Sequence, residues 1–141
     1  MNADELINEK DITIEKIKEI YSSAFIRIEP HESGESFYVN EGRPGFNVIL
    51  ENDLFLIRYL CYFDLTSNLD EPKILKCINR INQQFRLIRT SFEDKNNKQS
   101  INFDCYISYK GGITPYHLIN DGRIFQTIVS SILLDEDIQK L

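Results

Sequence analysis

Residues 54–65 read Leu-Phe-Leu-Ile-Arg-Tyr-Leu-Cys-Tyr-Phe-Asp-Leu and form the most apolar segment of the sequence. Aromatic and branched aliphatic side chains of this kind favour a β-strand. The segment also contains Arg58 and Asp64, and it is far shorter than the roughly 20 apolar residues that a membrane-spanning helix needs. The sequence therefore predicts a long strand over residues 54–65.

This predicted strand is apolar on both of its faces. The positions expected to face the helices are Phe55, Ile57, Tyr59, Cys61 and Phe63. The opposite face carries Leu54, Leu56, Arg58, Leu60, Tyr62 and Asp64. Three large aliphatic side chains and a tyrosine are too apolar for a sheet face that lies fully in water. We therefore expect this face to be covered. The covering group is either a loop or the N-terminal segment with Leu6 and Ile7, or else a second copy of the chain or a client peptide that lies across the sheet.

Shorter strands are expected before this segment, at residues 25–29, 36–40 and 46–50. Turn-forming residues separate them, so the first two strands should form a hairpin. A helix should precede them, because the Thr13 hydroxyl can cap the first turn and apolar residues then recur at helical spacing up to Ala24.

A second group of elements follows the long strand. A helix should begin at Asp70 or Glu71, because Pro72 fits its first turn. Two further strands, at residues 85–93 and 100–109, should form a second hairpin.

The last expected helix begins after Thr114, which can cap it, and continues to Leu133. The pair Asp121 and Gly122 weakens its middle and leaves open whether the helix is interrupted there.

Strands grouped between helices indicate the α+β class. The sequence predicts a mostly antiparallel, twisted sheet of five to six strands with helices packed on it, in the order α-β-β-β(-β)-α-β-β-α. The chain has 141 residues, enough for one hydrophobic core. We therefore expect a single domain over residues 1–141, with residues 1–11 as a loosely ordered extension.

Composition restricts the partners and the compartment. The chain has 22 acidic and 16 basic side chains and a net charge of −6, so it lacks the basic surface of a nucleic-acid-binding protein. No segment has the length of a membrane span or of an export signal. Cys61, Cys77 and Cys105 are widely spaced, which suggests neither a disulfide framework nor a zinc site. A reduced cytoplasm is the expected location.

Few residues suggest chemistry. No sequence pattern places a nucleophile next to His31 or His117. The acidic turn around His31 also lacks the spacing of metal ligands. We expect no catalytic, cofactor-binding or metal-binding residue. Asn82 lies on an apolar helix face, where an unpaired amide is costly, so it should bond to a sheet edge or a loop backbone.

Residues 73–98 contain seven basic side chains against two acidic ones. Either the acidic ends of the chain balance this charge in space, or the segment is a docking face for an acidic partner.

Two short motifs carry a family resemblance. They are Ile-Asn-Arg-Ile-Asn at residues 78–82, followed by a hairpin, and Gly-Gly-Ile-Thr-Pro at residues 111–115. Together with the order of elements back to about residue 12, they resemble the YbjN-like family of bacterial proteins. The resemblance implies a type III secretion chaperone-like fold, frequent dimerisation, and a role in protein binding or regulation. The family is described as a sensory transduction regulator.

The expected function is that of a non-enzymatic, chaperone-like regulatory module of a bacterial cytosol, which binds a protein or peptide partner or forms a homodimer. The residues expected to make these contacts are Leu56, Arg58, Leu60, Tyr62 and Tyr106. The alternative is a small-molecule sensor or an enzyme whose site leaves no sequence motif. A deep pocket lined by His117 or Cys105, with strongly perturbed titration, would favour this alternative.

Overall fold

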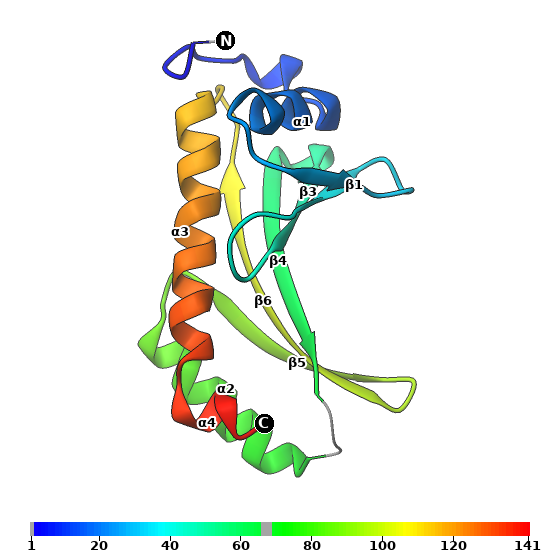
Figure 1. Cartoon of the computed structure of the whole chain (residues 1–141), viewed down its shortest axis with the longest axis vertical. Coiled ribbons are helices and arrows are strands. Elements are labelled where there is room, and N and C mark those ends of the chain that lie inside the picture. Colours follow the sequence, from blue (N-terminus) through cyan, green and yellow to red (C-terminus); the bar gives the residue numbers. More distant parts are fainter. Residues whose placement is uncertain (1, 66–68) are drawn as a thin grey trace.

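Six strands form one antiparallel sheet in the order β1-β2-β3-β4-β6-β5 in the computed structural model, which describes residues 2–65 and 69–141. The strands are β1 (Ile28–Pro30), β2 (Ser36–Val39), β3 (Phe46–Glu51), β4 (Leu56–Asp64), β5 (Arg89–Lys95) and β6 (Lys98–Ser108). The helices are η1 (Glu9–Asp11), α1 (Ile14–Ser23), η2 (Asn52–Leu54), α2 (Glu71–Gln84), α3 (Pro115–Leu133) and α4 (Glu136–Gln139). Figure 1 shows α3 running along the sheet, α1 at one end and α2 with α4 at the other. The predicted α+β class and mostly antiparallel sheet are confirmed.

β4 lies in the middle of the sheet, between β3 and β6. Ile57, Tyr59 and Cys61 point into the core, as the alternation predicted. The predicted start of the strand is wrong by two residues. Leu54 ends η2, and Phe55 has a left-handed backbone with φ of 55°, so the strand begins at Leu56.

Two threonines cap the main helices as predicted. The Thr13 Oγ1 atom accepts a hydrogen bond from the Lys16 N–H at 3.1 Å, and the Thr114 Oγ1 atom accepts one from the His117 N–H at 3.1 Å. Each bond satisfies one of the free N–H groups of a first helical turn.

α3 continues without interruption through Gly122, which settles the question that the sequence left open. A Cβ atom at this position would lie 2.6 Å from the Tyr21 Oη atom and 3.2 Å from the Phe46 ring. The glycine therefore serves close packing of α3 against the core and does not break the helix.

Two predicted strands begin later than expected. Phe25 does not start a strand: its N–H group donates to the Ser22 carbonyl as α1 ends, its φ is 63°, and β1 begins at Ile28. The last turn of α1 includes residues that the alternating pattern had assigned to the start of the predicted strand at residues 25–29. After α2, β5 likewise begins at Arg89 and not at residue 85.

The N-terminal segment is held at the start of α3. Ile7 and Ile113 exchange two backbone hydrogen bonds, and the Gly111 N–H donates to the Glu9 carboxylate at 2.8 Å. The Tyr116 N–H donates to the Ala3 carbonyl. Residues 2–11 are thus tied to the domain, and they do not cover the apolar face of β4.

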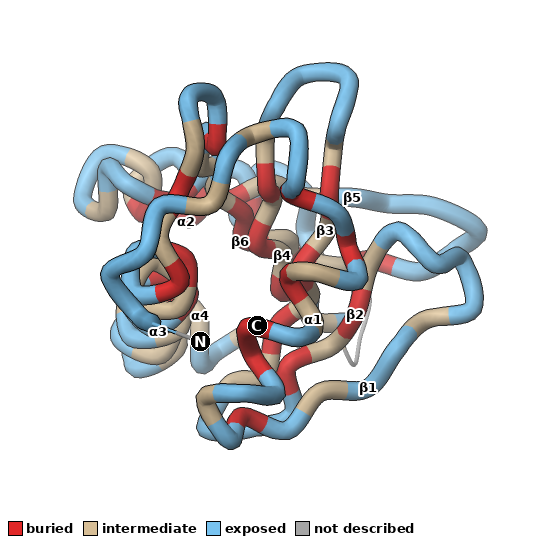
Figure 2. The backbone as a smooth tube through the Cα atoms, turned by 90° about the horizontal axis from the view of Figure 1, so that it is seen from above, coloured by how far each residue is buried: buried red, intermediate tan, exposed pale blue. Residues whose placement is uncertain are grey.

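One hydrophobic core joins α1, α2, α3 and the strands. Figure 2 shows buried residues recurring along β3, β4 and β6. Over most of each strand every second residue is buried in the core. The other side chains of these strands form the outer face of the sheet. Within residues 2–65 and 69–141, no helix is long and apolar enough to cross a membrane.

Candidate functional site

The residues expected to bind a partner lie together on the outer face. Leu56, Arg58, Leu60 and Tyr62 alternate along β4, and Tyr106 of β6 stands directly opposite Arg58. Tyr62 is 57% exposed and Tyr106 is 41% exposed, although both belong to interior strands of the sheet. Leu56 and Leu60 are half-buried.

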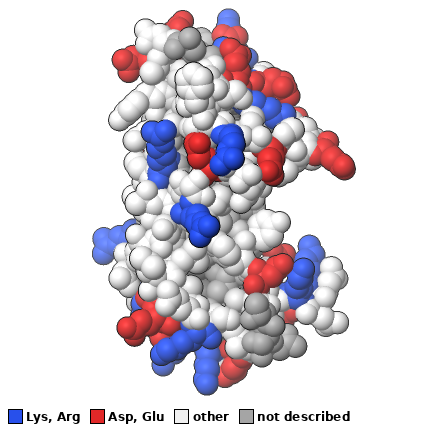
Figure 3. Space-filling model, viewed as in Figure 1, with Lys and Arg blue, Asp and Glu red and all other residues white. Residues whose placement is uncertain are grey.

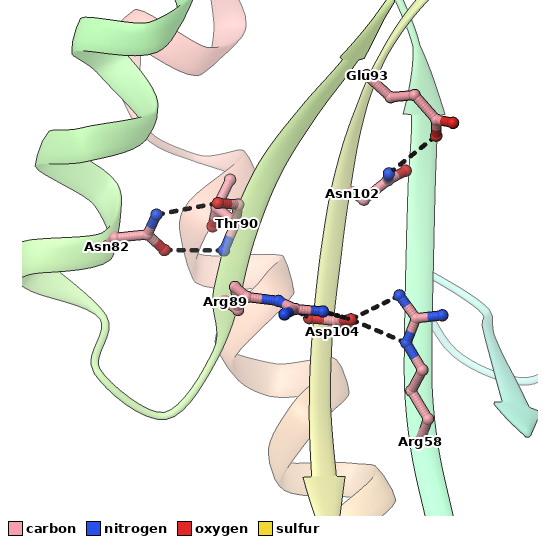
Figure 4. A network of polar contacts seen from close by, with 7 residues as sticks. All are labelled: Arg58, Asn82, Arg89, Thr90, Glu93, Asn102 and Asp104. Atoms are coloured by element: carbon pink, nitrogen blue, oxygen red, sulfur yellow. Dashed lines mark hydrogen bonds and ion pairs between the residues drawn. The ribbon is translucent and has the colours of Figure 1, made fainter. Parts of the chain in front are cut away.

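A buried carboxylate organises this face. Asp104 of β6 lies between Arg58 of β4 and Arg89 of β5 (Figure 4). The Arg58 Nε and Nη2 atoms donate to Asp104 Oδ2 at 2.8 and 2.6 Å. The Arg89 Nε and Nη2 atoms donate to Oδ1 at 3.0 Å and to Oδ2 at 2.7 Å. Two guanidinium groups thus share one carboxylate across three adjacent strands, and we call this set the Arg-Asp-Arg bridge.

The bridge keeps Asp104 ionised. Burial pushes the pKa of this carboxyl upward, but hydrogen bonds and positive charge from Arg89 and Arg58 together outweigh burial and hold the pKa below its usual value. The same contacts raise the pKa of Arg89. The bridge carries a net charge of +1, and its guanidinium groups are partly open to solvent, at 25% exposure for Arg58 and 63% for Arg89.

Tyr106 extends the bridge toward the sheet surface. The Arg58 guanidinium carbon lies 5.8 Å from the centre of the Tyr106 ring, within the range of a cation–π contact. This contact restricts both side chains, so an exposed ring and a cation are presented in a defined geometry.

Two open pockets flank the bridge. The Arg86 pocket has a volume of about 390 Å³, and Arg86, Leu87, Arg89 and Tyr106 are among its lining residues. The Tyr62 pocket has a volume of about 310 Å³. Its lining includes Arg58, Leu60, Tyr62, Asp64, Glu93, Ser100 and Asn102. The outer face is therefore cationic beside the first pocket and acidic at the far end of the second.

Asn82 bonds to a sheet edge, as its sequence position indicated. Its Nδ2 atom donates to the Thr90 carbonyl at 2.9 Å, and its Oδ1 atom accepts from the Thr90 N–H at 2.8 Å (Figure 4). The side-chain amide thus takes the place of a neighbouring strand at this point of the edge strand β5. Its role here is structural.

Basic side chains of residues 73–98 form ion pairs at three separate places. Arg80 pairs with Asp135 at 2.7 Å and with Asp137 at 3.0 Å, Lys98 pairs with Asp64 at 3.2 Å, and Arg89 belongs to the bridge. Figure 3 shows Lys and Arg side chains gathered over α2 and α4 at the lower end of the molecule. Acidic residues near the C-terminus thus balance part of this charge.

Sequence reasoning missed Asp104, and it counted Arg89 only as one of the basic residues of the segment at residues 73–98. A signal existed, because Asp104 is the only acidic residue of β6 and lies at an outward position, and Arg58 occupies an equivalent position of β4. Their cross-strand neighbourhood depends on the β4–β6 and β5–β6 registers, which the sequence does not show.

Of the residues expected to mark a small-molecule or enzymatic site, Cys105 lines the Arg86 pocket, which is open to solvent and not deep. Burial raises the pKa of the Cys105 thiol, and also that of the Cys61 thiol, to about 12, so both stay protonated at neutral pH. His117 is exposed and pairs with Asp121 at 2.9 Å. His31 bonds to Ser36 at 2.7 Å. In the described part of the chain, no three His, Cys, Asp or Glu side chains are placed to hold a metal ion.

Comparison with known proteins rests on structure. No family model matches the sequence. No protein of curated function matches it either. A solved structure of YbjN from E. coli, which is provisionally described as a transcription regulator, superposes with a TM-score of 0.77 over 92% of this chain and 95% of that chain. The chain has a YbjN-like fold.

The sequences of this chain and YbjN are 11% identical, so the likeness concerns the fold alone. It confirms the resemblance that the motifs at residues 78–82 and 111–115 indicated. The agreement covers nearly the whole of both chains.

Proposed function

We propose that this chain is a non-enzymatic protein-binding module that docks a partner protein, or a second copy of itself, on the outer face of its sheet. One observation carries the proposal. Large side chains in the middle of the sheet, Tyr62 and Tyr106 above all, lie exposed, while the helices and the N-terminal segment pack elsewhere.

The chemistry of this face suits a protein interface. Tyrosine and arginine are enriched among the residues that contribute most to binding, because they combine apolar area with directed hydrogen bonds. Arg58 and Tyr106 already restrict one another, so less side-chain entropy is lost when they are buried.

The YbjN-like fold supports a regulatory or chaperone-like role in a bacterial cytosol. The E. coli structure is provisionally described as that of a transcription regulator. Protonated cysteines and an exposed histidine offer no activated nucleophile at neutral pH.

The test compares two variants that each remove exposed tyrosine. Leu60→Thr combined with Tyr62→Thr removes apolar area from the outer face and keeps residues that favour strands. Tyr116→Gln is the matched control, because it removes a ring that is exposed on α3. Light scattering measures self-association, and capture from the native host measures partner binding.

The wild type and Tyr116→Gln should give the same assembly or the same captured proteins, and the outer-face variant should lose them. If the outer-face variant remains folded and retains both self-association and every captured protein, the proposal is wrong.

A further inference from the structure

We infer that the outer face binds an extended, acidic segment of its partner, with a carboxylate in the Arg86 pocket and apolar side chains over Leu60 and Tyr62. This inference rests on the proposed function, and it adds the chemistry and the register of the bound segment.

The charge around the Arg86 pocket is the first argument. Arg86 and Arg89 line the pocket together with Asp104, and Arg58 pairs with the same Asp104 carboxylate, so three arginines against one carboxylate leave an excess of two positive charges. Within the described residues, Arg86 has no ion pair. A molecule with net charge −6 therefore presents a local cationic site, and a carboxylate is the complementary group.

Apolar walls next to these cations are the second argument. Leu87, which is 73% exposed, and Tyr106, which is 41% exposed, line the Arg86 pocket together with Arg86 and Arg89. A guanidinium group next to exposed apolar area binds a carboxylate more strongly when the ligand also excludes water from the pair. A small inorganic anion would leave Leu87 and Tyr106 exposed, whereas a peptide would cover them.

The strand geometry gives the register. Arg58, Leu60 and Tyr62 are alternate residues of β4, so consecutive members are about 6.6 to 6.8 Å apart along the strand. An extended peptide that runs along the sheet has the same spacing between alternate side chains. Arg58 and Arg89 both donate to Asp104 Oδ2, at 2.6 and 2.7 Å, so their guanidinium groups are neighbours, and Arg89 also lines the Arg86 pocket. A carboxylate beside these two arginines, at the rim of the pocket, thus places apolar side chains two and four residues away over Leu60 and Tyr62.

The end of the outer face that lies away from Arg58 is acidic, so a bound segment cannot place its carboxylate there. Asp64 and Glu93 line the Tyr62 pocket, and each has one polar partner, Lys98 at 3.2 Å and Asn102 at 3.3 Å. A second carboxylate at that end would meet two acidic side chains. The bound segment should therefore be acidic at one end and apolar in the middle.

Fluorescein-labelled peptides that contain Glu-Ser-Leu-Ser-Leu or Leu-Ser-Leu-Ser-Glu test the inference, because the two orders cover both directions along the sheet. Each peptide has a control in which lysine replaces glutamate. Fluorescence anisotropy with the full chain at low salt should show that at least one glutamate peptide binds about tenfold more tightly than its lysine control, and added salt should reduce the difference.

The Arg86→Glu variant should reverse this preference. Lys95→Glu, which makes the same change of charge at the tip of the β5–β6 hairpin, should leave it unchanged. Equal binding of glutamate and lysine peptides, an unchanged preference in Arg86→Glu, or no binding by any peptide would overturn the inference. Equal binding that is lost in the Leu60→Thr/Tyr62→Thr variant would still support docking on the outer face, so the two proposals fail separately.

Discussion

Asp104 is the only acidic side chain that is buried in the part of the chain that the structure describes. A buried carboxylate is stable only when strong donors replace its lost hydration, and here two arginines from different strands supply them. The bridge therefore ties β4, β6 and β5 together and fixes two cations on the outer face.

Asp104→Asn should lower the free energy of unfolding by about 2 kcal/mol at pH 7, because a neutral amide leaves two guanidinium groups poorly paired. The contribution of Asp104 should depend on pH with a defined sign. Its folded pKa is lowered, so the stabilisation is present above the unfolded pKa of about 4 and is lost as the pH falls through the folded value.

Urea unfolding of the wild type and of Asp104→Asn at several pH values measures this effect. The difference between the two proteins should shrink between neutral pH and pH 3. A constant difference would mean that the carboxylate charge does not stabilise the fold.

Gly122 is a second residue with a specific task, because it lets α3 approach Tyr21 and Phe46. Gly122→Ala should destabilise the protein by about 1–3 kcal/mol through overpacking, although alanine favours helices. Thr127→Ala, at an exposed position of the same helix, should be neutral or slightly stabilising. Thermal unfolding of both variants checks the prediction, and a stabilised Gly122→Ala would contradict the packing described here.

Phe25 combines a left-handed backbone with 91% exposure of its side chain. Phe25→Gly should raise the free energy of unfolding by about 1 kcal/mol, because glycine adopts a positive φ without strain. Phe25→Ala keeps the Cβ atom, so it should change stability much less. Equal effects of the two substitutions in urea unfolding would show that the ring, and not the backbone, determines the effect.

At the scale of elements, α2 protects the edge of the sheet. β5 is an edge strand, and its Thr90 backbone would be free to pair with another chain if Asn82 did not bond to both its N–H and C=O groups. β1, the other edge strand, is short and ends in Pro30, which cannot donate a hydrogen bond.

Asn82→Ala should lower the free energy of unfolding by about 1–3 kcal/mol, because it leaves two polar groups of Thr90 without partners. The Thr90 amide hydrogen should also exchange faster. Gln83→Ala changes a neighbouring exposed side chain of α2 and should have little effect on either quantity. Unchanged exchange at Thr90 in Asn82→Ala would contradict the edge role.

At the scale of the whole molecule, one core lies between the helices and one face of the sheet. The opposite face is organised by the Arg-Asp-Arg bridge and left open. This asymmetry places the candidate site on rigid strands, where its side chains keep their relative positions without a ligand.

A single core predicts cooperative unfolding. Circular dichroism at 222 nm, which follows the helices, and the near-ultraviolet tyrosine signal, which follows packing around Tyr21, Tyr59 and Tyr109, should give the same thermal midpoint. Two separated midpoints would show that part of the chain unfolds independently.

The sequence determined the elements and their class, because hydrophobic period, capping residues and turns act over a few residues. Thr13 and Thr114 begin their helices as predicted, and the alternation in β4 separates the buried face from the outer face. The starts of β1, β4 and β5 were misplaced, because alternation does not show where the backbone still belongs to a preceding helix or turn.

Only the tertiary structure decided the site. Tyr62 and Arg58 could be named from the sequence, but Arg89 and Asp104 join them through pairings between strands that are far apart in the chain. The position of the N-terminal segment also depended on a distant partner, Ile113. Local patterns determine which residues face outward, whereas register and long-range packing determine which of them meet.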